Sequence, residues 1–465
     1  MNFNPFNYFR NKRQPKALAG FSKEILEAYN NNRPLGPQKK LCLAPSRNMF
    51  FDQTGQVNAC GWNNGHPLGK YPEQSVSEIW ESSATQALRD SISNNDLSNG
   101  CQVCKHYLLA GNFSNIKSHH YDYLSENVGH PFPLRMDFAL SNVCNLQCQT
   151  CYGELSSTIR KNREGLPQIQ SVYDDAFVDQ LRPFIPHLKA ACFLGGEPFL
   201  VPIYYDIWNL FAELNGNANI AITTNATVLN DRVKNIMEAC NFDIAVSRDA
   251  MDHTKLEKLR LGTNSRAQLD NIEFFNDYCK RKNKPFGLNA ILSSLNWADL
   301  VDVIRYCNSI EAKIYVCTVM FPAQHSIRKM PVSDLTRIRD LYEKELSDLP
   351  TATEIEQLNK KALEGALREV IYAIEQTPFN TNSAENLTVE LFLQKAAQFA
   401  KHVGADENKA VAMLQNALDR MSKDASKERF NHFIQLAHNP DEFELVMSHL
   451  IWRDEESIYN YRHLV

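Results

Sequence analysis

The sequence predicts an α/β protein whose centre is a partial (β/α)6 barrel of parallel strands. Short apolar runs of strand length alternate there with amphipathic stretches of helical length, a pattern typical of parallel strands joined by helical crossovers. Beyond Pro331 only helical periodicity remains and glycine is rare, which indicates a separate helical region. The six expected strands are residues 134–141, 190–194, 218–224, 242–247, 285–292 and 312–319.

The composition changes along the chain, and we expect five segments. Prolines and polar residues interrupt every short apolar stretch near the start, so this part should be weakly ordered. In the helical region, apolar residues at helical spacing form two patterns, which end at Pro350 and Pro378. The segments are a weakly ordered N-terminus (1–38), a small cysteine-containing module (39–110), a connector (111–133), the barrel (134–331) and an all-helical C-terminal domain (332–465).

Charge and hydropathy argue against several classes of function. The formal net charge of the 465 residues is −5, which gives no electrostatic footprint for nucleic acid. No apolar run reaches the ~18 residues of a membrane helix, and residues 1–15 lack the apolar core of a signal peptide. We therefore expect a cytoplasmic protein without a membrane or nucleic-acid partner. Its twelve cysteines should be mostly reduced thiols or metal ligands.

Three cysteines follow the first expected strand of the barrel at a spacing of C-x3-C-x2-C. They are Cys144, Cys148 and Cys151. Three thiolates this close can bind three irons of a cubane [4Fe–4S] cluster and leave the fourth iron open. A structural zinc site would need a fourth ligand, and the next histidine downstream is His187. The loop therefore indicates a reactive iron–sulfur cluster.

This cysteine loop, placed after strand one of a six-unit β/α pattern, resembles the radical SAM superfamily. The resemblance covers roughly residues 134–325. It implies that S-adenosylmethionine (SAM) binds the open iron through its amino and carboxylate groups. Reduction of the cluster then cleaves SAM to a 5′-deoxyadenosyl radical, which abstracts hydrogen from a substrate. An external one-electron reductant such as flavodoxin or ferredoxin is implied as a partner.

A glycine motif at the end of the second expected strand supports the same resemblance. Gly195, Gly196 and Glu197 precede Pro198, and the two glycines allow the backbone to pass close to a ligand. Taken alone, the motif also fits a plain turn from strand to helix. It resembles the GGEP motif of the family, whose backbone and glutamate hold the amino group of SAM.

Polar residues at the ends of the third and fourth expected strands are further candidates for binding SAM. Thr224 and Asn225, and then Ser247, resemble family positions that meet the ribose and the carboxylate of SAM. Arg260 resembles the arginine that pairs with this carboxylate, a pairing that a guanidinium favours. As an alternative, the hydroxyl residues cap strands and Arg260 is a solvated cation at a helix end.

Four more cysteines, in two pairs, lie before the barrel. They are Cys42, Cys60, Cys101 and Cys104. Four thiolates suit either a tetrahedral zinc ion or a closed iron–sulfur cluster, and the spacing alone favours zinc. The pattern also resembles the auxiliary-cluster module called SPASM, or its short form, twitch. This resemblance favours an iron–sulfur cluster over zinc. The further cysteines of a second auxiliary cluster are missing, so the resemblance implies one auxiliary [4Fe–4S] cluster, in a module that unusually precedes the barrel.

The leading hypothesis is a radical SAM enzyme that oxidises or crosslinks its substrate with the help of the auxiliary cluster. Family members with this module often modify peptides, while others dehydrogenate small molecules, and both substrate classes stay open. A non-catalytic scaffold for zinc or electron transfer is the alternative of a different class. No catalytic acid or base can be assigned.

Two other features have two explanations each. The run from His119 to Tyr123 is consistent with a binding motif, and equally with a connector packed on the barrel. Cys192 and Cys317 are expected to be small buried residues, although both could instead face the interior of the barrel.

Overall fold

The computed structural model describes residues 22–423, except for 64, 110, 112, 114–115, 126–130, 320–321, 382–387 and 403–404, and it also describes scattered residues between 430 and 458. A nine-stranded sheet forms its centre, with the strand order β11-β10-β8-β7-β6-β4-β1-β2-β3. Six strands from β4 to β11 run parallel. The prediction of a parallel α/β barrel is thereby confirmed. The strands of this sheet are β1 (Asn48–Phe51), β2 (Gln56–Asn58), β3 (Gly69–Lys70), β4 (Arg135–Phe138), β6 (Ala190–Phe193), β7 (Asn219–Thr224), β8 (Phe242–Ser247), β10 (Phe286–Leu292) and β11 (Lys313–Thr318).

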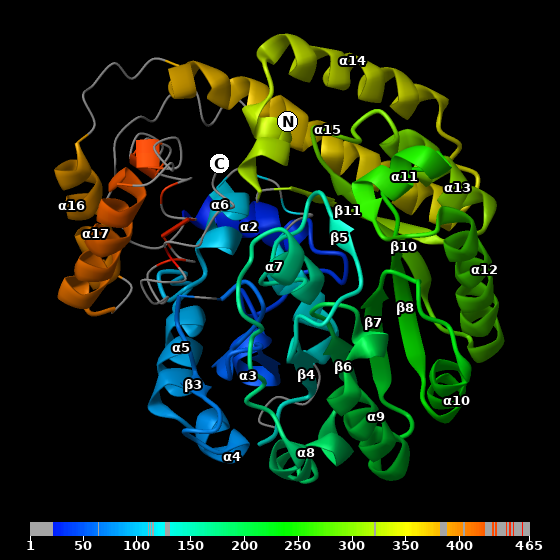
Figure 1. Cartoon of the computed structure of the whole chain (residues 1–465), viewed down its shortest axis with the longest axis horizontal. Helices are drawn as coiled ribbons and strands as arrows, with labels where there is room; N and C mark the ends of the chain where they lie inside the picture. The colour runs from blue at the N-terminus through cyan, green and yellow to red at the C-terminus, as the bar shows by residue number, and fades with distance from the viewer. Residues whose placement is uncertain are drawn as a thin grey trace.

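Helices cover one side of the parallel strands (Figure 1). Alternate residues of each strand are buried against them, as in β8, where Phe242, Ile244 and Val246 are almost fully buried. The residues between them point to the opposite side, which we call the inner face of the sheet. The helices of this part are α8 (Asp175–Leu181), α9 (Pro202–Leu214), α10 (Asp231–Ala239), α11 (His253–Leu259), α12 (Ser265–Lys282) and α13 (Leu300–Ser309).

The cysteine-containing module extends the barrel sheet. Its strand β1 pairs in parallel with β4, with Phe51 opposite Phe138, and their rings stack at 5.6 Å between centroids. The antiparallel partner β2 follows a turn at Asp52–Gly55. The helices around it are α3 (Ala44–Arg47), α4 (Val76–Trp80), α5 (Ser83–Ser93), α6 (Gln102–Leu109) and the 3-10 helix η2 (Lys117–Leu124).

Part of the segment expected to be weakly ordered has a defined structure. Helix α2 (Lys23–Asn31) buries Tyr29, and the nearby Arg33 forms a buried ion pair with Asp122 of η2. The buried Tyr29 ring and this long-range ion pair therefore hold a stretch of sequence that lacks a strong local pattern. Residues 1–21 lie outside the described part of the chain.

The helical region contains two separate apolar cores. Helices α14 (Val332–Asp348) and α15 (Glu354–Thr381) share the core of the barrel, and α15 packs on β11. Helices α16 (Val389–His402) and α17 (Glu407–Lys423) belong to a second cluster. Helix α15 is described as far as Thr381 and so continues past Pro378, where the pattern was expected to end.

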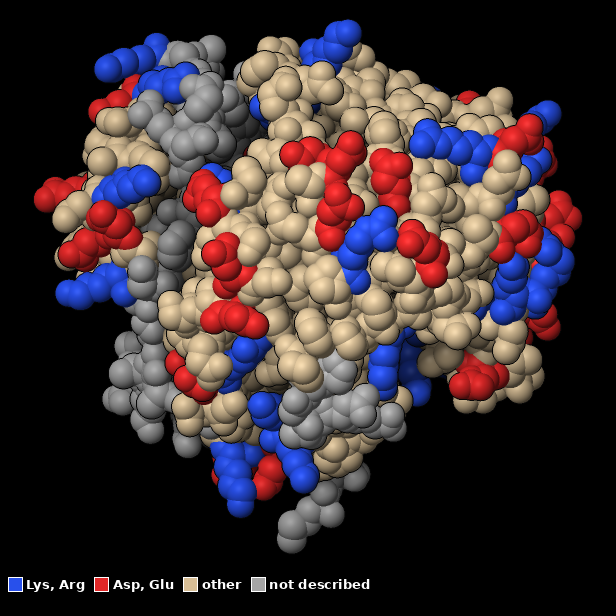
Figure 2. All heavy atoms as spheres, turned by 90° about the horizontal axis from the view of Figure 1, so that it is seen from below, with Lys and Arg blue, Asp and Glu red and all other residues tan. Residues whose placement is uncertain are grey.

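Acidic and basic side chains are interspersed on the face of the molecule that Figure 2 shows. Neither sign of charge dominates that face. Within the described part of the chain, no helix combines the length and the hydropathy that crossing a bilayer requires.

Candidate active site

The three cysteines of the C-x3-C-x2-C motif lie on the loop that follows β4. Cys148 is part of a short strand, β5 (Gln147–Cys148), which pairs with β9 (Arg260–Leu261) and places Cys148 opposite Arg260. The Cys151 N–H donates to the Cys148 carbonyl at 3.2 Å. The Cys144 N–H donates to Ser157 Oγ, also at 3.2 Å, at the start of α7 (Ser157–Asn162). The loop is thus held by a strand pair and a helix.

The surroundings of these thiols suit a bound cation. Burial raises the pKa of all three thiols, and for Cys151 it reaches about 12 because Cys148 and Cys144 add to the effect of burial. Ionised thiols at this place therefore need a positive charge close by, which an iron–sulfur cluster supplies. The donor set fits the cluster that the motif predicts.

Gly195 and Gly196 lie against the backbone of the cysteine loop. Both have positive φ values, +79° and +52°. A Cβ atom on Gly195 would lie 2.6 Å from the Ser141 carbonyl oxygen, and one on Gly196 would lie 2.1 Å from that of Val143. The Glu197 N–H donates to the same Val143 oxygen at 2.7 Å. The close approach that these glycines permit is therefore between two loops of the protein.

The Glu197 side chain joins the ends of β6 and β7. It is fully buried, and it accepts hydrogen bonds from Thr224 Oγ1 and from the Asn225 N–H, both at 2.7 Å. Burial raises the pKa of this carboxyl to about 7. Asn225 Nδ2 donates to Asn145 Oδ1 at 3.0 Å and lies 3.9 Å from Cys144 Sγ. The glycine loop, the β7 end and the cysteine loop therefore meet at one point.

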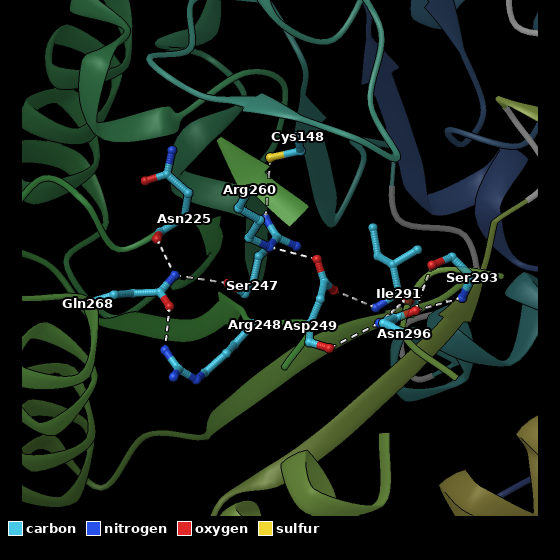
Figure 3. Close-up of polar contacts among 10 residues, drawn as sticks. All are labelled: Cys148, Asn225, Ser247, Arg248, Asp249, Arg260, Gln268, Ile291, Ser293 and Asn296. Carbon is cyan, nitrogen blue, oxygen red and sulfur yellow. Dashed lines mark hydrogen bonds and ion pairs between the residues drawn. The ribbon is translucent and has the colours of Figure 1, made fainter. Parts of the chain in front are cut away.

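Arg260 lies between a carboxylate and a thiol (Figure 3). Its Nε is 2.7 Å from Asp249 Oδ2, and its Nη1 is 3.9 Å from Cys148 Sγ. Asp249 follows β8 and also accepts from the Ile291 N–H at 2.9 Å. Arg260 is thus a buried, paired side chain next to the cysteine loop, and the alternative of a solvated cation does not describe it.

Gln268 of α12 connects the two strand ends that carry the other candidates. Its Nε2 donates to the Asn225 carbonyl at 2.8 Å and to the Ser247 carbonyl at 3.1 Å. Its Oε1 accepts from Arg248 Nη1 at 2.8 Å (Figure 3). Sequence reasoning missed this residue, because no motif surrounds it and its partners are more than 19 positions away.

The four upstream cysteines surround a common cavity. Cys42, Cys60, Cys101 and Cys104 all line it, together with mainly apolar residues. Four thiols around a shared space suit either a closed iron–sulfur cluster or a tetrahedral zinc ion.

Hydrogen-bond donors reach the sulfurs of this cavity. Asn63 Nδ2 donates to Cys101 Sγ at 3.2 Å, and the Ala44 N–H donates to Cys42 Sγ at 3.4 Å. The pKa values of Cys42 and Cys101 lie far above the usual range. Burial is the larger cause, and the neighbouring thiols are the smaller one. Polar donors that face buried sulfurs are suited to thiolates, so this site also fits iron–sulfur ligation.

Sequence comparison assigns the two cysteine-bearing regions to families. Residues 138–307 match the radical SAM superfamily, and residues 42–105 match an iron–sulfur cluster-binding domain, SPASM. The chain thus carries a radical SAM domain with a SPASM module before it, and the prediction of this unusual order is confirmed. The domains imply a SAM-binding [4Fe–4S] cluster, SAM and an auxiliary iron–sulfur cluster.

Two curated proteins resemble part of the chain. A probable GTP 3′,8-cyclase of Methanocella arvoryzae is 24% identical over 249 residues, which are 52% of this chain and 74% of that protein. A GTP 3′,8-cyclase of Aquifex aeolicus is 26% identical over 179 residues, 37% of this chain and 53% of the relative. The chain thus spans about three quarters of the first relative and about half of the second.

Solved structures with SAM bound are also similar to part of the chain. Streptococcus suis SuiB bound to SAM has a TM-score of 0.36 at 16% identity, over 59% of this chain and 62% of SuiB. The anSMEcpe structure with SAM has a TM-score of 0.35 at 15% identity, over 46% of this chain and 60% of that one.

Proposed function

We propose that this protein is a radical SAM enzyme that oxidises or crosslinks its substrate. When bound, SAM and the two clusters would supply reductive cleavage to a 5′-deoxyadenosyl radical, hydrogen abstraction from the substrate, and a place for the electron that the substrate loses. An external donor such as flavodoxin or ferredoxin would supply the initial electron. The substrate is a peptide or a small molecule.

The residues of the chain have distinct roles in this proposal. Cys144, Cys148 and Cys151 bind the SAM-binding cluster, and Glu197 orients the amino group of SAM. Arg260 pairs with the SAM carboxylate, while Thr224, Asn225 and Ser247 position its ribose and carboxylate. Gly195 and Gly196 keep the glycine loop against the cysteine loop. The auxiliary cluster is held by Cys42, Cys60, Cys101 and Cys104.

One observation supports the proposal most strongly. The three-cysteine loop lies in direct contact with the Gly196 loop, with Asn225 and with Arg260. These contacts bring residues from four separated parts of the sequence to the C-terminal ends of the parallel strands. Active sites of barrels built from parallel strands lie at that end. The proposal places the auxiliary site in the module at 39–110 and the SAM site in the barrel at 134–331.

Anaerobic reconstitution followed by iron counting and a 5′-deoxyadenosine assay tests the proposal. We expect about eight irons per chain, because each cubane holds about four, together with SAM cleavage. Cys148→Ala should lose about four irons and all cleavage, whereas Cys307→Ala, a buried thiol outside both sites, should keep both. Bound zinc without any SAM cleavage would instead support the alternative of a non-catalytic scaffold for zinc or electron transfer.

A further inference from the structure

The turn that follows β7 contains a residue in the left-handed region of backbone space. Ala226 has a φ of +55° and is fully buried. This conformation is unfavourable for a residue with a side chain, whereas glycine adopts it freely. Residues in strained conformations persist only where the surrounding structure holds them, and they gather at functional sites. Contacts from other parts of the chain should therefore keep Ala226 in place.

The residues on both sides of Ala226 contact the cysteine loop. Asn225 Nδ2 donates to Asn145 Oδ1 at 3.0 Å, and Asn145 Nδ2 donates to Thr227 Oγ1 at 2.9 Å. The Thr227 N–H also donates to Asn225 Oδ1 at 2.9 Å. Asn145 directly follows Cys144. The conformation at Ala226 therefore determines how the end of β7 meets the loop that carries the three cysteines.

Two amide side chains of α12 hold the backbone of this turn. Asn271 Nδ2 donates to the Ala226 carbonyl at 2.8 Å, and Gln268 Nε2 donates to the Asn225 carbonyl at the same distance. The two side chains are three positions apart in the helix, so they project from one face of it. The pairing of β7 with β8 has ended at Thr224, so these amides supply the hydrogen bonds that the buried carbonyls need.

Arg248 fixes the orientation of the Gln268 amide. The Arg248 side chain is fully buried, and its Nη1 donates to Gln268 Oε1 at 2.8 Å. Because a guanidinium has only donors, the amide oxygen faces Arg248 and the NH2 group faces the two carbonyls. The second of these is the Ser247 carbonyl, at 3.1 Å (Figure 3). Gln268 therefore sets the separation of the strand ends that carry Asn225 and Ser247.

We propose that Gln268 and Asn271 are positioning residues for SAM binding, which act by holding the turn at Ala226. Both contact backbone carbonyls, so they act through Asn225 and Ser247, which are proposed to position the ribose and carboxylate of SAM. Loss of either amide would leave a buried carbonyl unpaired and let Ala226 relax towards a negative φ. This inference rests on the proposed function, because it concerns SAM binding at the same site.

Equilibrium binding of labelled SAM to the reconstituted enzyme tests this inference. Asn271→Leu removes the donor at nearly constant size, and it should raise the Kd for SAM roughly fivefold or more. Gln268→Glu keeps an acceptor for Arg248 but turns an oxygen towards the two carbonyls, and it should raise the Kd roughly tenfold or more. The iron content should stay at the wild-type value in both variants.

A matched control lies on the same helix. Asn276 is also a buried asparagine of α12, and its Nδ2 donates to a backbone carbonyl, that of Ile310, at 3.1 Å. Asn276→Leu should lower the thermal stability, as Asn271→Leu does, but it should leave the Kd for SAM unchanged. An equal rise of the Kd in these two variants would indicate a general effect of α12 packing and would overturn the inference.

Ala226→Gly gives a test that is specific to the turn. Glycine adopts a φ of +55° without steric cost, so Ala226→Gly alone should bind SAM as the wild type does. Combined with Asn271→Leu, it should bring the Kd back to within about twofold of the wild type, because the turn then keeps its conformation without the Asn271 contact. No recovery, or a wild-type Kd in Asn271→Leu and Gln268→Glu, would overturn the inference.

The wild type shows separately whether the proposed function holds. If it cleaves SAM while both α12 variants bind SAM with wild-type affinity, only the positioning role is wrong. If the wild type neither binds nor cleaves SAM, the proposed function is refuted, and the positioning role is refuted with it.

Discussion

Single residues explain why the cysteine loop and the glycine loop must come together as they do. Gly196 has a φ of +52° and no room for a side chain, because the Val143 carbonyl occupies the place of its Cβ. Arg260 reaches both Asp249 and Cys148. Each residue therefore couples two parts of the site, and each gives a prediction.

Gly196→Ala should disrupt the cysteine loop. Its methyl group would lie 2.1 Å from a backbone oxygen, so we expect a loss of roughly 2–4 kcal/mol in the free energy of unfolding and poor retention of the first cluster. Thermal unfolding and iron counting measure the two effects. Gly216→Ala is the matched control, because its nearest atom outside its neighbours lies 3.8 Å away. If Gly196→Ala and Gly216→Ala had the same thermal stability and the same iron content, this explanation would be wrong.

Arg260→Gln should weaken SAM binding. The guanidinium is the buried cation next to the cysteine loop, so its loss should raise the Kd for SAM roughly tenfold or more. Equilibrium binding of labelled SAM to the reconstituted variant measures this, with the iron content showing that the cluster is retained. Arg266→Gln, on an exposed position of α12, should leave the Kd unchanged. An unaltered Kd in Arg260→Gln would exclude a role in SAM binding.

Secondary-structure elements show how much of the fold could be predicted. Strand β8 was expected at 242–247 and has these bounds, because alternating burial leaves a strong local pattern. The parallel pairing of β1 with β4 was not expected, since it joins segments 87 residues apart. Likewise, the Gln268 contacts depend on α12 packing against the ends of β7 and β8. Local patterns thus predicted the elements and the cysteine motifs, but not the contacts between them.

Asp243 of β8 gives a prediction about stability and pH. Burial raises the pKa of this carboxyl to about 6 from its ordinary 3.8, so the folded state binds its proton more tightly than the unfolded state. Stability should therefore fall as the pH rises from about 4 to about 6 and then stay level. At pH 7.5, Asp243→Asn should be more stable than the wild type by on the order of 1–2 kcal/mol, with little difference near pH 4.5.

Thermal unfolding of the wild type and Asp243→Asn at several pH values tests this prediction. Asp277→Asn, at an exposed position of α12, serves as the control for a change of one charge. A gain in stability that is the same at pH 4.5 and 7.5 would show that ionisation of Asp243 is not its cause.

The whole molecule joins two cysteine sites in one continuous sheet. Because β1 pairs with β4, the cavity of the upstream cysteines and the barrel are held in a fixed relation. We propose separate roles for the two sites, so they should be separable by mutation. Cys101→Ala should lose about four irons and the product of the complete reaction, but it should still cleave SAM. Loss of SAM cleavage in this variant, with the first cluster retained, would contradict the division of roles.

Electron paramagnetic resonance of the reduced, reconstituted enzyme tests the central claim most directly. If Cys144, Cys148 and Cys151 leave one iron open to SAM, adding SAM must change the spectrum of one cluster and leave that of the auxiliary cluster unchanged. The change should persist in Cys101→Ala and disappear in Cys148→Ala. A spectrum that SAM does not alter, or one altered equally in both variants, would contradict the assignment of the SAM-binding cluster to these three cysteines.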